Sequence, residues 1–277
     1  MSGRLEGQVA FITGAARGQG RAHAVRLAEE GADIIAVDIC APVETVGYPM
    51  SSADDLAETV ALVEKFGGRA VAFETDVRDF DALTADLKQG VAELGRLDIV
   101  VANAGILTMG AAHEQSEEQW STMLDVNLTG VWHTVKAAIP ILIDQGTGGS
   151  MILTSSLMGL KGGSWAISYA AAKFGVVGIT KSLAIELAPH RIRVNTVHPT
   201  NVHTPMLDND FIIRTLAPDV TDPTWADTSE FLSSMNAWPL PTIEAQDVSN
   251  AVLFLASEES RFVTGISLPI DLGATAK

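Results

Sequence analysis

Tyr169 and Lys173 stand four positions apart in the stretch SYAAAKFGVVGITKSLAIEL. On a helix this spacing puts both side chains on one face, one turn apart. The pKa of a free phenol is about 10, but an ammonium roughly 4 Å away stabilises the phenolate by up to about 4 kcal/mol at an effective dielectric constant of about 20. Tyr169 is therefore a candidate general acid/base, with Lys173 expected to lower its pKa.

The spacing of Tyr169 and Lys173 also occurs on many amphipathic helices, so its meaning depends on neighbouring residues. Ser156 lies 13 residues before Tyr169, at the end of an apolar run, where its hydroxyl can hydrogen-bond a carbonyl or alkoxide oxygen. The adjacent Ser155 is expected to be structural. Together the three side chains indicate interconversion of an alcohol and a ketone, with Tyr169 exchanging the proton.

A glycine-rich turn indicates a dinucleotide cofactor for that reaction. The segment TGAARGQG at 13–20 follows an apolar run and precedes an alanine-rich stretch with helical spacing. In this context glycines let the backbone approach a pyrophosphate at a helix N-terminus, whereas elsewhere they could form merely a tight turn. The predicted cofactor contacts in this turn are Gly14, Arg17, Gly18, Gln19 and Gly20.

Asp38 indicates which nicotinamide cofactor is used. It ends the next apolar run, 18 residues after Gly20, where a carboxylate can accept hydrogen bonds from the adenosine ribose hydroxyls. Its charge would repel the 2′-phosphate of NADP, whereas Arg17 could attract it. Because no second basic residue follows Asp38 closely, the sequence favours NAD. The alternatives are that Asp38 only caps the strand edge and that Arg17 is merely solvated.

Short apolar runs alternate along the chain with stretches of helical spacing. The runs occupy residues 9–13, 33–38, 69–74, 98–102, 150–154 and 191–197; the helical stretches occupy 20–30, 54–66, 80–94, 117–143, 169–187 and 243–256. This alternation predicts an α/β fold: a doubly wound parallel sheet of the Rossmann type, three layers thick, in a single domain over 1–277.

Two segments interrupt the alternation. Residues 39–53 are long for a strand-to-helix connection and are expected to form an insertion near the adenosine site. Residues 200–242 are rich in Pro, Asp and Trp and are expected to form a substrate lid.

Composition narrows the class of partner. A formal net charge of −16 disfavours binding to nucleic acid, because that affinity comes from Lys and Arg. The single cysteine, Cys40, excludes an internal disulfide and is given no catalytic role. The sequence has neither a secretory signal nor an apolar run of membrane-spanning length. We therefore expect a cytoplasmic protein that acts on a small molecule, without a metal, a membrane or a nucleic-acid partner.

The order and spacing of its motifs resemble those of the short-chain dehydrogenase/reductase family over nearly the whole chain. The matching segments are TGAARGQG at 13–20, TDV at 75–77, ANAG at 102–105, LDVNLTG at 124–130, Ser156, Tyr169-x-x-x-Lys173 and HPT-x-V-x-T at 198–204. The resemblance implies a catalytic tetrad of Asn127, Ser156, Tyr169 and Lys173. It also implies that the cofactor is contacted by Asp76 and Val77 at adenine, by Asn103, Gly105, Tyr169, Lys173 and Val202, and by Thr204 at the nicotinamide carboxamide.

Two of these implied roles have alternatives. An amide such as Asn127 can keep a local kink in a helix and hold a water that relays protons from Lys173, or it can simply be a satisfied polar residue. Asp76 can instead be a helix N-cap. The chain also departs from the family pattern, with Ala102-Asn103 where two asparagines are usual and Pro199-Thr200 where Pro-Gly is usual. Because Thr tolerates positive φ poorly, the backbone path at Thr200 is left open.

The expected substrate is apolar. Its wall is predicted from Trp165, Met206, Phe211, Trp225, Met235 and Trp238, each of which could instead pack in the core or in a subunit interface. The insertion, with CAPV and YPMSSADDL, is similar to that of the carveol-dehydrogenase-like subfamily associated with mycofactocin in actinobacteria. That resemblance implies a cyclic terpenoid alcohol such as carveol, NAD retained beneath the insertion, and a separate redox carrier that recycles it.

Other functions remain open on the sequence alone. A general 3-oxoacyl or steroid ketoreductase would use the same residues, although an acidic protein suits an acidic acyl carrier poorly. A non-catalytic NAD-binding regulator would need the glycine turn but not Ser156, Tyr169 and Lys173. Family resemblance also implies a homotetramer assembled through the long helices at 117–143 and 169–187.

Overall fold

The computed structural model describes residues 3–277 of the chain. Within them, seven strands form one parallel sheet in the order β3-β2-β1-β4-β5-β6-β7. The strands are β1 Val9–Thr13, β2 Asp33–Asp38, β3 Ala70–Glu74, β4 Ile99–Ala102, β5 Gly149–Thr154, β6 Ile192–Pro199 and β7 Ser267–Ile270. The predicted doubly wound sheet is confirmed. The seventh strand was not predicted, because it is a four-residue edge strand that contains a proline.

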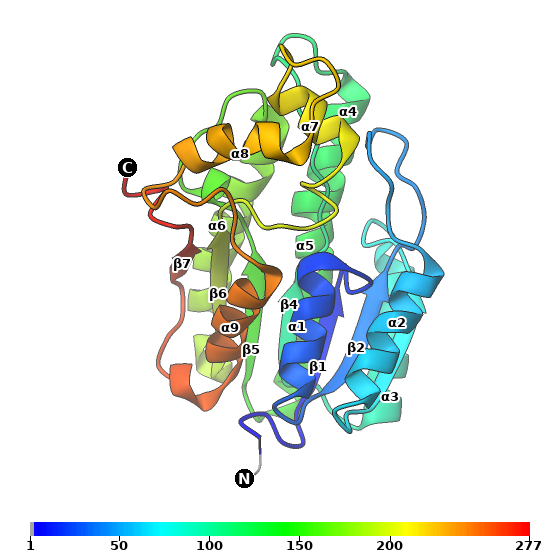
Figure 1. Cartoon of the computed structure of the whole chain (residues 1–277). Helices are drawn as coiled ribbons and strands as arrows, with labels where there is room; N and C mark the ends of the chain where they lie inside the picture. Colours follow the sequence, from blue (N-terminus) through cyan, green and yellow to red (C-terminus); the bar gives the residue numbers. More distant parts are fainter. Residues whose placement is uncertain (1–2) are drawn as a thin grey trace.

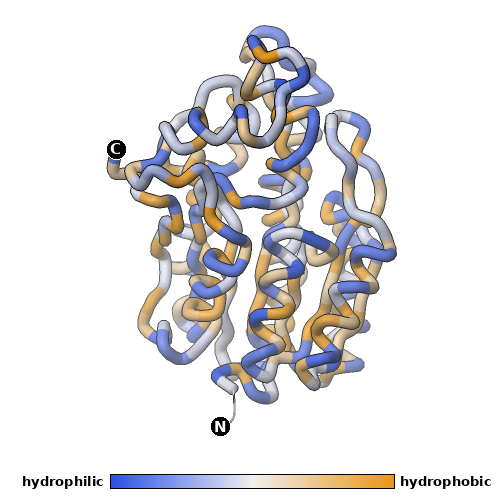
Figure 2. Tube along the Cα trace, in the orientation of Figure 1, coloured by the Kyte–Doolittle hydropathy of each residue, from blue (hydrophilic) through white to orange (hydrophobic). Residues whose placement is uncertain are grey.

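Helices cover both faces of the sheet (Figure 1). One face carries α1 Gly18–Ala28, α2 Ala53–Glu64 and α9 Ala245–Ala256; the other carries α3 Phe80–Leu94, α5 Gly130–Gln145 and α6 Ile167–Glu186. Successive side chains of a strand point to opposite faces, so Ile12 packs under the first group of helices and Phe11 under the second. Figure 2 shows the matching alternation of apolar and polar stretches along the helices.

The segment 200–242 is not the continuous loop that its composition suggests. It contains α7 Asp210–Leu216 and α8 Trp225–Ser234, which lie beyond the carboxyl ends of the strands (Figure 1). Asn209 caps α7 by accepting from the Ile212 N–H at 3.0 Å, and Thr224 and Asp227 form a capping box at the start of α8. These caps allow short helices to form in a polar stretch without a long apolar face.

The helix predicted at 117–143 is two residues longer in the structure and changes from α-helical to π-helical geometry over one short segment. It consists of α4 Glu117–Leu124, a π-helical segment Asp125–Thr129 and α5, which together run continuously over Glu117–Gln145. Among the described residues this helix is long and apolar enough to cross a membrane, so the expectation that no segment reaches that length is wrong. Half of its most apolar window is buried against the rest of the fold, as in a core helix of a globular protein.

Candidate active site

A cleft opens at the carboxyl ends of β1 and β4, where the strand order changes direction. Doubly wound sheets bind ligands at this switch point. The structure brings nearly all predicted site residues to the wall of the cleft: Gly14, Arg17, Gly18, Gln19, Gly20, Asp38, Asp76, Val77, Asn103, Gly105, Ser156, Tyr169, Lys173, Val202 and Thr204. Asn127 is buried behind this wall and does not line it.

Tyr169 and Lys173 lie on successive turns at the start of α6. The Lys173 ammonium is 5.5 Å from the centre of the Tyr169 ring. It donates a hydrogen bond of 2.8 Å to the carbonyl of Thr154, the last residue of β5. The ammonium is therefore fixed between the catalytic helix and the sheet.

The pKa of Tyr169 differs from the expectation based on spacing. Burial raises the pKa of the phenol above its ordinary value, and a hydrogen bond with Ser156 opposes that rise. Burial also lowers the pKa of Lys173 to about 8. The net shift of the Tyr169 pKa is therefore upward and not downward as expected, because desolvation of the phenol outweighs the effects that favour the phenolate.

Ser156 follows β5 and opens a short 3-10 turn, Leu157–Gly159. Its Oγ accepts a hydrogen bond of 3.1 Å from the Met158 N–H, which leaves the hydroxyl hydrogen for another acceptor. The neighbouring Ser155 is buried and donates to the Lys173 carbonyl at 2.9 Å, so it anchors the catalytic helix as predicted.

Asn127 occupies the π-helical segment, in agreement with the predicted kink. Its Oδ1 accepts from the Ile106 N–H at 2.9 Å and its Nδ2 donates to the Ile106 carbonyl at 2.8 Å. The amide is thus satisfied by one residue of the loop after β4, as in the structural alternative. Relay of protons from Lys173 through a water stays a prediction.

Gly105 leaves the space in which these groups meet. A Cβ atom at this position would stand 2.8 Å from Asn127 Oδ1 and 3.7 Å from Lys173 Nζ. A larger side chain would therefore displace the Asn127 amide, whereas the distance to Lys173 Nζ is an ordinary van der Waals contact.

The glycine turn has the shape that a pyrophosphate requires. Gly14 has φ of 68°, and a Cβ there would lie 2.8 Å from Ala104 Cα. A Cβ at Gly20 would lie 1.9 Å from the Gly14 carbonyl oxygen, so the start of α1 packs directly on the turn. Gln19 carries a buried Oε1 atom that lacks a hydrogen-bond partner. The turn has no room for side chains at Gly14 and Gly20 and carries a polar atom without a partner, and both features fit a dinucleotide cofactor.

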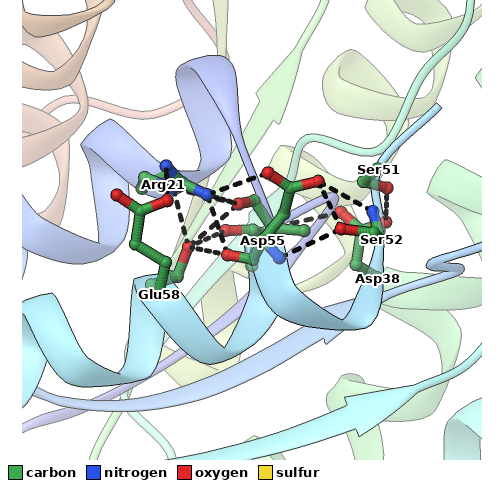
Figure 3. Close-up of polar contacts among 9 residues, drawn as sticks. Arg21, Asp38, Ser51, Ser52, Asp55 and Glu58 are labelled. Carbon is green, nitrogen blue, oxygen red and sulfur yellow. Dashed lines mark hydrogen bonds and ion pairs between the residues drawn. The ribbon is translucent and has the colours of Figure 1, made fainter. Parts of the chain in front are cut away.

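Asp38 is held by the protein itself. Its Oδ2 accepts from the Ala16 N–H at 2.9 Å, and its Oδ1 accepts from the Ser51 hydroxyl at 2.6 Å (Figure 3). The carboxylate still lines the cleft, so it can accept a further hydrogen bond from a ribose. It does more than cap a strand edge, because it joins the glycine turn to the end of the insertion.

Arg21 was not singled out from the sequence, yet it supports the glycine turn. Its guanidinium donates to the Ala16 carbonyl at 2.7 Å and pairs with Glu58 at 2.7 Å and Asp55 at 3.5 Å on α2 (Figure 3). An arginine one turn into the first helix, followed by acidic residues in the second, was the available signal.

Asp76 and Asn103 lie on either side of this turn in the cleft wall. Asp76 pairs with the Arg78 guanidinium at 2.6 Å, whereas the N-cap of α3 is Asp79, so the alternative role of Asp76 as a helix cap is excluded. Asn103 donates to the carbonyls of Thr13 at 3.2 Å and Gly14 at 3.3 Å. It thereby fixes the glycine turn to the end of β4.

The insertion at 39–53 reaches further than expected. Besides the contact of Ser51 with Asp38, the insertion is bound by Arg17 of the glycine turn, which donates a hydrogen bond of 2.5 Å to the Pro49 carbonyl. Tyr48 Oη then accepts from the Leu107 N–H at 3.0 Å and lines the same cleft as Tyr169. A Cβ at Gly47 would lie 2.7 Å from the Phe211 ring, so the insertion also touches α7 of the lid.

The predicted aromatic wall is mostly wrong. Of the six residues proposed, Met206 lines the cleft. Trp225 stacks on His203 at 5.1 Å, and Trp165 and Trp238 are more than half exposed. The apolar lining comes mainly from side chains that were not proposed: Val43, Tyr48, Met50, Ile106, Leu107, Leu157, Met158, Pro205 and Leu207. Their positions in four separate loops gave no pattern to detect.

Two further sequence expectations are resolved. Thr200 is not among the residues with positive φ, and its hydroxyl donates to Asn236 Oδ1 at 2.9 Å, so its side chain ties β6 to the end of the lid. Cys40 is half-buried, and burial, aided by the charge of Asp38, raises the pKa of its thiol to about 12. Such a thiol is a poor nucleophile at neutral pH.

Comparison with known proteins agrees with this geometry. The model of the short chain dehydrogenase family matches residues 8–212. The chain is 52% identical to (-)-trans-carveol dehydrogenase of Rhodococcus erythropolis, over 99% of both chains. Its structure superimposes with a TM-score of 0.98 on carveol dehydrogenase from Mycobacterium avium in complex with NAD, at 53% identity over 99% of this chain and 100% of that one. A short chain dehydrogenase from Mycobacterium paratuberculosis bound to NAD gives a TM-score of 0.91 at 47% identity, with the same coverage. The protein therefore belongs to the short-chain dehydrogenase family.

Proposed function

We propose that this protein is an NAD-dependent alcohol dehydrogenase that interconverts a hydrophobic secondary alcohol, a cyclic terpenoid such as carveol, and its ketone. The observation that carries the proposal is the meeting of Ser156, Tyr169 and Lys173 in a cleft whose opposite end holds the glycine turn and Asp38. Full-length similarity to carveol dehydrogenases supports the substrate class.

The residues that would hold the cofactor are those of the cleft wall. The glycine turn would take the pyrophosphate, Asp38 the adenosine ribose, Asp76 and Val77 the adenine, and Thr204 the carboxamide. When bound, NAD supplies the acceptor for the hydride of the carbinol carbon. The negative charge of Asp38, with the Arg17 guanidinium already engaged by Pro49, supports NAD over NADP.

Proton transfer falls to Tyr169. In oxidation, the Ser156 hydroxyl donates a hydrogen bond to the substrate oxygen while the phenolate of Tyr169 accepts the alcohol proton. In reduction, the neutral phenol returns that proton to the ketone oxygen. Lys173 favours the phenolate through its positive charge, and Asn127 keeps the loop at Ile106 in place. General acid–base assistance of this kind is typically worth about 10²–10⁴ in rate.

A panel of alcohols tests this function. The wild-type protein should reduce NAD with carveol and other cyclic secondary alcohols and leave charged hydroxy acids unchanged, because the substrate end of the cleft is lined by apolar side chains. Tyr169→Phe should lower the activity about 10²–10⁴-fold while NAD binding, measured by calorimetry, is kept. Activity that is unchanged by this substitution, or that is confined to charged alcohols, would overturn the proposal.

The same proposal includes retention of NAD beneath the insertion, with reoxidation by a separate redox carrier such as mycofactocin. The contacts of Ser51 with Asp38, Pro49 with Arg17 and Tyr48 with Leu107 support it, because they hold the insertion against residues that line the cleft. Protein purified without added cofactor should contain NAD, and Ser51→Ala should release it faster than the exposed control Glu44→Ala. An empty site that turns over free NAD rapidly would contradict retention.

We further propose that the protein is a homotetramer assembled through α5 and α6. Exposed apolar side chains on these helices support this: Trp132, Phe174 and Ile185, the last with 80% of its surface exposed. Sedimentation should give four times the mass of the chain, and Ile185→Glu should shift it toward smaller species. A wild-type monomer would contradict the assembly.

A further inference from the structure

His198 lies inside the protein directly behind the catalytic serine. It belongs to β6, is fully buried, and its Nδ1 is 2.7 Å from the carbonyl oxygen of Ser156. On the other side of the ring, Nε2 is 2.8 Å from the hydroxyl of Thr196, which is also fully buried. Neither contact is used by the reaction proposed above.

These two contacts fix the tautomer of the imidazole. A carbonyl oxygen can only accept, so Nδ1 must carry a hydrogen. Burial lowers the pKa of His198 and outweighs the hydrogen bond to the Ser156 carbonyl, which acts in the opposite direction; the charge of Lys173 adds to the lowering. The ring is therefore neutral at pH 7 and Nε2 is an acceptor. Nε2 then accepts a hydrogen bond from the Thr196 hydroxyl, whose oxygen is also 3.3 Å from the Ile266 carbonyl oxygen and from Ser267 Oγ. Lys181 and Asp271 are the other charged groups that act on this ring, and their effects oppose each other.

The Ser156 carbonyl is the point through which the ring can act on catalysis. It also accepts from the Gly159 N–H at 2.9 Å, which closes the 3-10 turn after β5. Its direction sets the peptide plane between Ser156 and Leu157. That plane, together with the extended backbone of Ser156 (φ −162°, ψ 166°), determines where the hydroxyl points.

We propose that His198, as the neutral Nδ1–H tautomer, is the positioning residue for Ser156 in the alcohol dehydrogenase reaction. The inference rests on the proposed function, because it needs Ser156 to contact the substrate oxygen. Loss of the bond lets the turn at Leu157–Gly159 shift, and a misplacement of about 1 Å at a reacting group can cost about 10²-fold in rate.

Two variants separate positioning from packing. His198→Leu fills a similar volume with an apolar side chain and removes the hydrogen-bond donor. His198→Asn places an amide Nδ2 donor about as far along the side chain as Nδ1. We expect His198→Leu to lower kcat about 10- to 100-fold without changing the amount of bound NAD, and His198→Asn to keep a kcat within about threefold of wild type. Equal losses in the two variants, or an unchanged kcat in His198→Leu, would overturn the proposal.

A double-mutant cycle with Ser156→Ala shows whether the effect passes through the serine. In the Ser156→Ala background, His198→Leu should cause no further loss of kcat; a loss as large as in wild type would refute positioning. The proposed function is tested separately by the single variant: a wild-type rate in Ser156→Ala would contradict the function itself.

The tautomer of His198 can be measured directly in the wild-type protein, so this test holds even if His198→Leu fails to fold. In a ¹H–¹⁵N spectrum of the wild-type protein at neutral pH, the imidazole signal that disappears in His198→Asn should show a protonated Nδ1 and an unprotonated Nε2. An Nε2–H tautomer or an imidazolium would contradict the proposal.

Discussion

The adenosine end and the catalytic end of the cleft use their polar groups in opposite ways. At the adenosine end, the Asp38 carboxylate accepts from Ala16, Ser51 and the Cys40 N–H, so the protein itself fixes its position. At the catalytic end, burial disfavours the charged forms of both Tyr169 and Lys173, raising the pKa of the first and lowering that of the second.

This difference separates binding from reactivity. The adenosine end is arranged by hydrogen bonds between protein groups, which set its shape and its negative charge. The catalytic end keeps ionisable groups in a poorly hydrated setting, which costs stability, lowers the pKa of Lys173 to about 8 and raises the pKa of Tyr169. Substitutions at the catalytic end should therefore change rate more than stability, and substitutions at the adenosine end should change cofactor choice.

Lys173→Met should show the largest effect. It removes the charge that favours the Tyr169 phenolate, so kcat should fall about 10²-fold or more, within the range for general acid–base catalysis. The Tm should stay level or rise, because a buried ammonium is replaced by an apolar side chain. The matched control is Lys181→Met on the same helix, whose ammonium is exposed and should leave kcat unchanged. A drop in Tm with little loss of kcat would contradict the view that the catalytic end affects rate more than stability.

Gly105→Ala should come next, with kcat lower by about 10-fold or more and stability lower by roughly 1–3 kcal/mol, because the new Cβ overlaps Asn127 Oδ1. Gly110→Ala in the same loop is the control, since a Cβ there has nothing within 4 Å. Steady-state kinetics and urea unfolding measure both quantities. Equal behaviour of the two variants would show that the Asn127 amide does not need this space.

Asp38→Asn tests the adenosine end. Removing the charge should raise the efficiency with NADP relative to NAD by about 10-fold, which corresponds to about 1.4 kcal/mol, and should leave kcat with NAD near its wild-type value. The ratio of kcat/KM for the two cofactors is the measurement. A large loss of kcat without a change in that ratio would mean that Asp38 acts on the chemistry.

His23 on α1 does not line the cleft, so its effect is on stability alone. Burial lowers the pKa of His23 to about 3, so the folded protein keeps it neutral while the unfolded chain takes up a proton below the ordinary pKa of 6.5. Stability contributed by this group is complete above pH 6.5 and is lost as pH falls toward 3, with roughly 2 kcal/mol lost at pH 5. His23→Gln should unfold in urea with a weaker pH dependence between 7 and 5; an identical dependence would contradict this assignment.

Much of the fold followed from the sequence because its signals are local. Buried strands such as Val9–Thr13 and Asp33–Asp38 are continuous apolar runs, and their predicted bounds agree with the structure. The edge strand Ser267–Ile270 and the helices α7 and α8 lack such runs, since they depend on a neighbouring strand or on end caps.

The site divides in the same way. The glycine turn, Asp38, Ser156, Tyr169 and Lys173 could be found from spacing along the chain. Tyr48 and His198 could not, because their partners are far away in sequence: Leu107 for Tyr48 and the Ser156 carbonyl for His198. The direction of the Tyr169 pKa was also beyond spacing, since it depends on burial.

The role of Tyr169 is tested most directly by the pH dependence of hydride transfer in a single turnover of NAD-loaded enzyme with excess carveol. Because the phenolate is the active form in oxidation and burial raises the pKa of Tyr169, the wild-type rate should climb with the loss of one proton as pH rises above neutrality. Tyr169→Phe should be about 10²–10⁴ slower and should lose this dependence. A Tyr169→Phe variant with the same pH profile as wild type would contradict Tyr169 as the general acid/base.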